Sequence, residues 1–154
     1  MTSADPVAGA LPVPRPLTIV LSSLSSDAHT WNLVFLQLLL EGMGHRVVNL
    51  GACVPDDVLL DECRRHRPDA VVISTVNGHG HIDGLRLIDR LRAEESLAGI
   101  PIIIGGKLTT EGDGARVAGE LLAAGFDAVF ADDTAGFRGY IEELAGRRPA
   151  LERP

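Results

Sequence analysis

This chain has little cysteine, no excess of positive charge and no long apolar runs. Its 154 residues include only Cys53 and Cys63, which form neither a disulfide scaffold nor a metal-binding motif. Lys and Arg number 14 against 21 Asp and Glu, and the formal net charge of -7 disfavours a nucleic-acid-binding protein. The longest apolar runs, such as 70–73 and 101–104, are too short to cross a bilayer.

The first residues also lack the features of a secretory signal, because no charged start is followed by a continuous apolar stretch. These absences predict a cytoplasmic protein that has neither a membrane nor a nucleic acid as its partner. Residues 1–16, with four prolines, and residues 147–154 show little periodicity, and we expect both to be flexible tails.

Between the tails, short β-type apolar runs alternate with longer segments that have helical spacing. The expected strands are 17–21, 46–50, 70–74, 101–104 and 128–130, and the expected helices are 31–43, 56–66, 82–93, 114–124 and 136–145. Five such repeats predict an α/β fold with a doubly wound, five-stranded parallel sheet, because right-handed crossovers place helices on both faces. We expect one flavodoxin-like (Rossmann-like) domain over residues 17–146.

Ligands of such sheets bind at the carboxyl ends of the strands, so the loops that follow the strands carry the information about function. The first loop holds Asp27 two residues before His29. A metal-binding histidine usually donates its second ring N–H to a carboxylate, and Asp27 could be that partner. Alternatively, Ser26, Asp27 or Thr30 caps the next helix and His29 is a solvated loop residue.

The third and fourth loops are rich in glycine, which allows a ligand to approach the backbone closely. In the third, Ser74 and Thr75 offer hydroxyl groups, while His79, His81 and Asp83 make a weak metal-site candidate or belong to a glycine-rich turn. The fourth opens with Gly-Gly at 105–106, which fits a bulky ligand or a plain tight turn. Neither a phosphate-binding P-loop nor a dinucleotide-binding GxGxxG motif is present.

Taken together, the loops resemble the signature of the cobalamin-binding family, Asp-x-His-x-x-Gly followed by Ser-x-Leu and Gly-Gly. The matching positions are 27–32, 74–76 and 105–106, in the same order and at strand ends. Two positions depart from that signature, since Asn32 replaces Gly and Val76 replaces Leu. Within the family, the extended third loop at 77–83 most resembles that of the small subunit of glutamate mutase (methylaspartate mutase).

The resemblance implies a cofactor whose benzimidazole base leaves cobalt, with His29 as the replacing lower axial ligand and Asp27 behind it. The tail of the cofactor would lie between the strand ends that carry Ser74 and Gly105–Gly106, where Asn32 would either hydrogen-bond it or crowd it. The expected cofactor-binding residues are Ser26, Asp27, Ala28, His29, Thr30, Ser74, Thr75, Val76, Gly78, Gly105, Gly106, Lys107, Leu108, Thr109 and Thr134.

The activity that the resemblance implies is that of an isomerase subunit, which binds adenosylcobalamin for a carbon-skeleton mutase. Because the loops lack an arginine cluster for a dicarboxylate, we expect a second, larger chain to hold the substrate. One alternative is a corrinoid carrier for methyl transfer, although such carriers usually have a helical cap that 16 residues could not form. Another is a non-enzymatic cobalamin sensor or receiver-like module, but Ser22, Ser23 and Ser74 stand where a receiver needs acidic residues.

Overall fold

The computed structural model describes residues 15–110 and 112–147, so most of both expected tails lies outside the described residues. The strands are β1 (Thr18–Ser22), β2 (Arg46–Asn49), β3 (Ala70–Thr75), β4 (Ile102–Gly106) and β5 (Ala128–Phe130). The helices are α1 (Trp31–Gly42), α2 (Asp56–His66), α3 (Gly80–Arg92), α4 (Gly114–Ala124) and α5 (Thr134–Arg147), with a short 3-10 helix, η1 (Glu95–Leu97).

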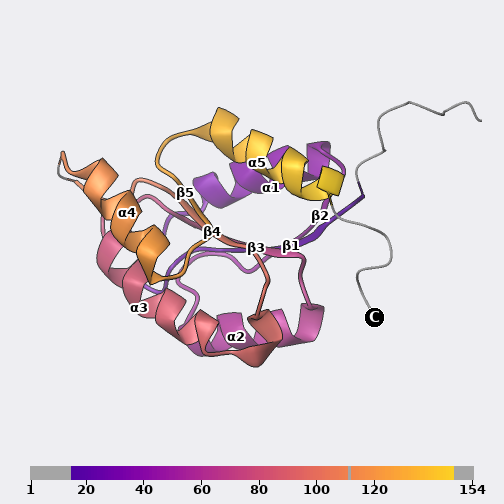
Figure 1. Ribbon diagram of the computed structural model, residues 1–154, viewed down its shortest axis with the longest axis horizontal. Helices are drawn as coiled ribbons and strands as arrows, with labels where there is room; N and C mark the ends of the chain where they lie inside the picture. The colour runs from indigo at the N-terminus through magenta and orange to yellow at the C-terminus, as the bar shows by residue number, and fades with distance from the viewer. Residues whose placement is uncertain (1–14, 111, 148–154) are drawn as a thin grey trace, which may run out of the picture.

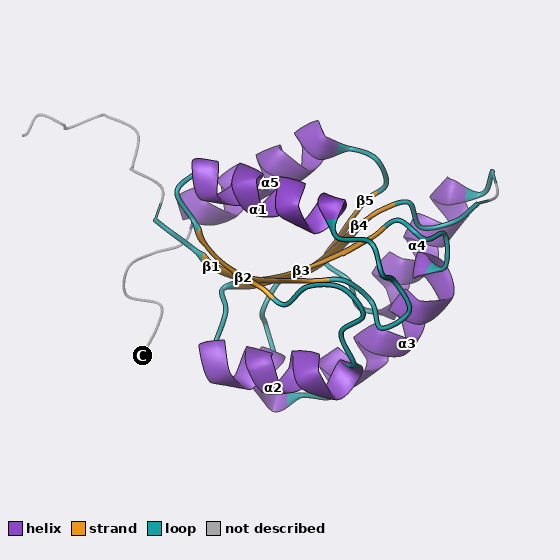
Figure 2. Ribbon diagram, turned by 180° about the vertical axis from the view of Figure 1, so that it is seen from behind, coloured by secondary structure: helices purple, strands orange, loops and turns teal. Residues whose placement is uncertain are grey.

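The expected five-stranded parallel sheet is confirmed, with the strand order β2-β1-β3-β4-β5. Helices α1 and α5 cover one face, and α2, α3 and α4 cover the other (Figure 1), an arrangement that Figure 2 shows from behind. Each face has its own apolar core, one containing Leu59, Leu87 and Val117 and the other Leu33 and Phe137. The fold is therefore the doubly wound α/β architecture that the alternating pattern predicts.

The local sequence explains why these elements form. Every residue of β3 is buried, as expected for a central strand covered on both faces. In α2, acidic residues occupy the first turn and basic residues the last, which complements the helix dipole. Within the described residues, none of the helices combines the length and apolar character that a bilayer crossing requires.

The main difference from expectation lies at the end of β4. The expected strand stops at residue 104, but β4 continues through Gly105 and Gly106, which pair with Ser74 and Thr75 of β3. The glycine pair is thus part of the sheet rather than a loop. Helices α3 and α5 also begin two residues earlier than expected, at Gly80 and Thr134.

The strand order brings the informative loops together. The chain runs outward from β1 to β2 and then returns to β3 on the other side of β1, so the direction of winding reverses between β1 and β3. Ser22 at the end of β1 pairs with Ile73 of β3, which places the loops after the two strands side by side. Such a reversal point is where ligands bind in this class of fold.

Candidate functional site

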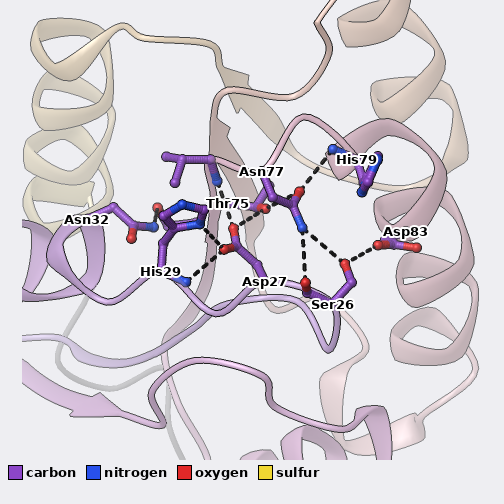
Figure 3. Close-up of polar contacts among 10 residues, drawn as sticks. Ser26, Asp27, His29, Asn32, Thr75, Asn77, His79 and Asp83 are labelled. Atoms are coloured by element: carbon purple, nitrogen blue, oxygen red, sulfur yellow. Dashed lines mark hydrogen bonds and ion pairs between the residues drawn. The ribbon is translucent and has the colours of Figure 1, made fainter.

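Asp27 holds His29 by two hydrogen bonds in the loop between β1 and α1. Its Oδ1 lies 2.9 Å from the backbone nitrogen of His29 and 2.6 Å from the ring Nδ1. The Asp27 side chain is completely buried, whereas 60% of the His29 side chain is exposed. The imidazole of His29 is therefore exposed at the surface, while the Asp27 carboxylate that contacts it is buried (Figure 3).

The second oxygen of Asp27 binds the end of β3. Thr75 donates its hydroxyl to Asp27 Oδ2 at 2.6 Å, and the N–H of Val76 donates to the same atom at 2.8 Å. Burial opposes ionisation, but the hydrogen bonds from Thr75 and from the N–H groups of His29 and Val76 outweigh it. They lower the pKa of the Asp27 carboxyl group to about 2.

The charge on Asp27 decides the tautomer of His29. A carboxylate has no hydrogen to donate, so the 2.6 Å contact requires that Nδ1 of the His29 ring be the donor. In the neutral ring the lone pair then belongs to Nε2, which makes no hydrogen bond to any described residue. The ring is exposed and oriented, with a carboxylate behind it, which is the arrangement that metal-binding histidines commonly have.

A further network links the first loop to the third (Figure 3). Asn77 donates from Nδ2 to the carbonyl of Ser26 at 3.2 Å, and its Oδ1 accepts from the N–H of His79 at 2.9 Å. The hydroxyl of Ser26 in turn donates to Asp83 at the start of α3. These hydrogen bonds hold the first and third loops together next to Asp27.

Two of the alternative interpretations are contradicted by the structure: helix capping by the first loop and a metal site in the third. Thr30 is the N-cap residue of α1, but its side chain makes no capping bond, and Asp27 binds β3 instead. His81 pairs with Glu120 of α4 at 2.6 Å, so His79, His81 and Asp83 do not converge. Across the described ranges, no three His, Cys, Asp or Glu side chains group as a metal site. His29 is consequently a candidate for a single-ligand role rather than part of a protein metal cluster.

A cavity of about 170 Å³ lies between α1, α5 and the ends of β3, β4 and β5, and Asn32, three residues after His29, is part of its lining. It brings together five of the expected contact residues, namely Ser74, Val76, Gly105, Gly106 and Thr134. The remaining lining residues are mostly apolar or aromatic: Asn32, Phe35, Leu36, Val72, Ile73, Ile103, Phe130, Asp132, Asp133 and Phe137. An apolar pocket with a few polar groups is typical of a site for an organic ligand.

The glycines at the cavity are required by the sheet itself. A Cβ on Gly105 would lie 2.7 Å from the carbonyl oxygen of Phe130, and one on Gly106 would lie 2.1 Å from that of Thr75. Gly106 also has a φ of +109°, a conformation that residues with side chains rarely adopt. These close approaches to neighbouring strands explain the glycine pair without any ligand.

Several expected contact residues lie away from the cavity. Leu108 is 4% exposed and packs in the core on the opposite face of the sheet, together with Leu87 and Val117. Thr109 hydrogen-bonds Asp113 at the start of α4. The other expected residues outside the cavity lining are Ser26, Asp27, Ala28, His29, Thr30, Thr75, Gly78 and Lys107.

Sequence reasoning missed the aromatic wall of the cavity. Phe130 ends β5, and its ring makes edge contacts with Phe137 and Tyr140 of α5 at centroid distances of 6.0 and 5.7 Å. Phe35 of α1 also lines the cavity. The available signal was that Phe130 lies just before the loop that follows the fifth expected strand. Whether its side chain faces the cavity depends on how α5 packs against β5, which the sequence does not show.

Comparison with known proteins agrees with this geometry. The chain matches the B12 binding domain model over residues 17–141. It is 34% identical to "Glutamate mutase sigma subunit" of Escherichia coli O157:H7 over 118 residues, which cover 76% of this chain and 78% of that protein. The similarity to the small subunit of a glutamate mutase, expected from the third loop, is thus confirmed.

Solved structures of corrinoid proteins share the fold. A cobalamin-binding protein from Desulfitobacterium hafniense superimposes with a TM-score of 0.71 at 23% identity, covering 86% of this chain and 60% of that one. The monomethylamine corrinoid protein of Methanosarcina barkeri gives 0.66 at 18% identity, covering 82% and 57%. Receiver domains of signalling proteins have this fold as well, so the fold by itself does not separate the two classes. The match to the family model over residues 17–141 does separate them, and the chain belongs to the B12 binding domain family.

Proposed function

We propose that this chain is the cobalamin-binding subunit of an adenosylcobalamin-dependent carbon-skeleton mutase and that His29 is the lower axial ligand of cobalt. The observation that carries the proposal is the exposed Nε2 of His29, whose lone pair is set by the hydrogen bond from Nδ1 to Asp27. The corrin ring supplies the equatorial ligands, so one protein nitrogen is sufficient. Asp27 would orient the imidazole and raise its basicity.

The cavity supports binding with the benzimidazole base detached from cobalt. A benzimidazole is a flat, mostly apolar ring, and Phe35, Phe130 and Phe137 offer an apolar surface in the cavity. Ser74 adds a hydroxyl at the end of β3. The residues present therefore fit a corrinoid whose tail enters the cavity, and His29 takes the place that the base leaves.

The described lining of the cavity does not complement an anionic substrate. Among the described residues that line the cavity, none is cationic, whereas Asp132 and Asp133 are acidic. Bound adenosylcobalamin would supply the cleavage of its cobalt–carbon bond, and the chain itself would hold and orient the cofactor. We therefore propose that a larger catalytic subunit binds the substrate, as the subunit name of the Escherichia coli relative suggests.

A methyl-transfer carrier could use the same histidine and the same cavity. The name of the relative that is 34% identical favours the mutase, whereas the corrinoid protein from Methanosarcina barkeri is similar only in fold. The two functions differ in the upper ligand of cobalt. A mutase subunit should support isomerisation when mixed with its larger partner, and a carrier should instead accept and release a methyl group.

The source of the axial nitrogen can be tested directly. The protein, uniformly labelled with ¹⁵N, is mixed with unlabelled cob(II)alamin, and the electron paramagnetic resonance spectrum is recorded. If His29 ligates cobalt, labelling the protein changes the axial-nitrogen splitting from a triplet to a doublet. His29→Ala should abolish that doublet, while His79→Ala, an exposed histidine of the third loop, should retain it. A triplet that labelling leaves unchanged would contradict the proposal, because the benzimidazole would still be bound.

A further inference from the structure

Asn32 is the polar side chain at the cavity that the family signature does not account for. It lies in the first turn of α1, where its Nδ2 donates to Ser74 Oγ at 2.8 Å across the edge of the cavity. The Oδ1 of the same amide is buried and has no hydrogen-bond partner among the described residues. One half of the amide is therefore satisfied and the other is not.

A buried carbonyl without a partner is costly, because it has lost its hydrogen bonds to water and gained none in return. A ligand group that donates a hydrogen bond to Asn32 would remove that cost. A purely apolar group would leave the cost in place. The amide therefore distinguishes ligands by the hydrogen-bond donors that they carry.

The charged groups at the cavity, Asp132 and Asp133, also favour ligands that carry hydrogen-bond donors. Asp132 and Asp133 follow β5, and their carboxylates can only accept hydrogen bonds when ionised. Asp133 already accepts from the N–H of Gly136 at 2.9 Å, which leaves its second oxygen for other donors. Both charged side chains of the cavity lining are thus acceptors, while the hydroxyls of Ser74 and Thr134 can donate or accept.

We infer that Asn32 makes this chain selective for the lower base of the corrinoid, with a base that carries N–H donors, such as adenine, preferred over dimethylbenzimidazole. The inference rests on the proposed function, because it requires the detached base to enter the cavity. Adenine offers an exocyclic amino group to acceptors, whereas the edge of dimethylbenzimidazole carries two methyl groups. Asn32 is in this sense a specificity-determining residue rather than a catalytic one.

The experiment compares the binding of two corrinoids that differ only in the lower base. Wild-type protein is titrated with dimethylbenzimidazolyl and adeninyl cob(III)amides, and quenching of the single tryptophan, Trp31, reports binding. The visible spectrum reports whether histidine is the axial ligand. We expect the adeninyl form to bind about tenfold more tightly, the usual worth of one recovered buried hydrogen bond.

Two variants separate hydrogen bonding from crowding. Asn32→Gly removes both the amide and its bulk, and Asn32→Leu keeps the bulk but removes the amide. Both should show a weaker preference for the adeninyl form than wild type does, and Asn32→Gly should also bind the dimethylbenzimidazolyl form more tightly than wild type does. Far-ultraviolet circular dichroism and the midpoint of urea unfolding confirm that each variant is folded.

The outcomes distinguish the inference from the function on which it rests. If both corrinoids bind through histidine with equal affinity in wild type and in both variants, the selectivity is refuted and the proposed function stands. A preference that Asn32→Leu retains in full also refutes it, because the amide of Asn32 would then not be its cause. If neither corrinoid binds, or if His29→Ala leaves the bound spectrum unchanged, the proposed function itself fails.

Discussion

Thr75 donates its hydroxyl hydrogen to Asp27 over 2.6 Å, although the two residues are 48 positions apart in the chain. This bond ties the loop that carries His29 to the end of the central strand β3. The sheet fixes the position of the buried Asp27 carboxylate, and the carboxylate in turn fixes the imidazole of His29. The orientation of His29 therefore depends on residues that would not themselves touch cobalt.

Replacing Asp27 with Asn should disrupt ligation by changing the tautomer of His29. If the amide oxygen keeps its bonds from Thr75 and Val76, the NH₂ group faces Nδ1 of His29, which must then accept, and the ring proton moves to Nε2. We expect the affinity for cob(II)alamin to fall about 10- to 100-fold, as is usual when such a carboxylate is lost. The protein-derived nitrogen splitting should weaken with it.

The matched control for that change is Asp83→Asn. Asp83 accepts from the Ser26 hydroxyl at the far end of the same network, and an amide oxygen can accept there equally well. Its affinity should stay close to that of wild type. Equal losses in the two variants would indicate a general effect of removing charge from these loops rather than an effect on the His29 tautomer.

Asp27 should also make the protein sensitive to acid. Its pKa is lowered in the folded state to about 2, so its contribution to stability is complete above the ordinary value of 3.8 and is lost as the pH falls from there toward 2. The shift corresponds to about 2 kcal/mol. Urea unfolding at a series of pH values should show a steeper decline for wild type than for Asp27→Asn.

Thr75→Val gives an independent check on that pH dependence. The substitution keeps the shape of the side chain but removes the hydroxyl that donates to Asp27. The pKa of Asp27 should rise toward its ordinary value, and the free energy of unfolding at neutral pH should fall by about 1–3 kcal/mol. An acid-induced decline as steep as in wild type would show that other carboxyl groups cause it.

A second pH dependence, at milder acidity, should come from His45. This buried histidine accepts a hydrogen bond from the N–H of Leu17 at 3.0 Å through Nδ1. Burial lowers its pKa below 6.5, although Asp69 acts in the opposite direction. The unfolded chain therefore binds a proton first, and stability falls as the pH decreases below 6.5 until the lower folded-state pKa is reached.

His45→Asn tests this origin, because an amide oxygen can replace Nδ1 as the acceptor but does not titrate. The variant should show a smaller loss of unfolding free energy between about pH 7 and pH 5 than wild type does. Equilibrium unfolding in urea at each pH measures the difference. Parallel curves for the two proteins would assign the pH dependence to other histidines.

The glycine at the end of β4 should tolerate no side chain. In Gly106→Ala the new Cβ would lie 2.1 Å from the Thr75 carbonyl, in a backbone conformation with a φ of +109°. We expect a loss of at least about 1–3 kcal/mol from the conformation alone. Gly119→Ala is the control, since a Cβ there contacts nothing within 4 Å and α4 should gain about 0.5–1 kcal/mol. Thermal unfolding of both variants measures the contrast.

Local sequence was sufficient for much of this molecule. Apolar runs and helical spacing predicted all five strands and all five long helices, because burial on both faces of a parallel sheet leaves a strong pattern. The pairing of Asp27 with His29 was also predictable, since two residues in one loop are close whatever the rest of the chain does.

Other features depend on contacts between distant segments. The role of Thr75, the continuation of β4 through Gly105 and Gly106, and the bond between Asn32 and Ser74 follow from the register of β3 against its neighbours. The sequence alone determined which groups are present at the strand ends and in what order. Only the tertiary structure decided which of them meet, because a hydrogen bond between segments 42 or 48 residues apart requires the sheet to be assembled first.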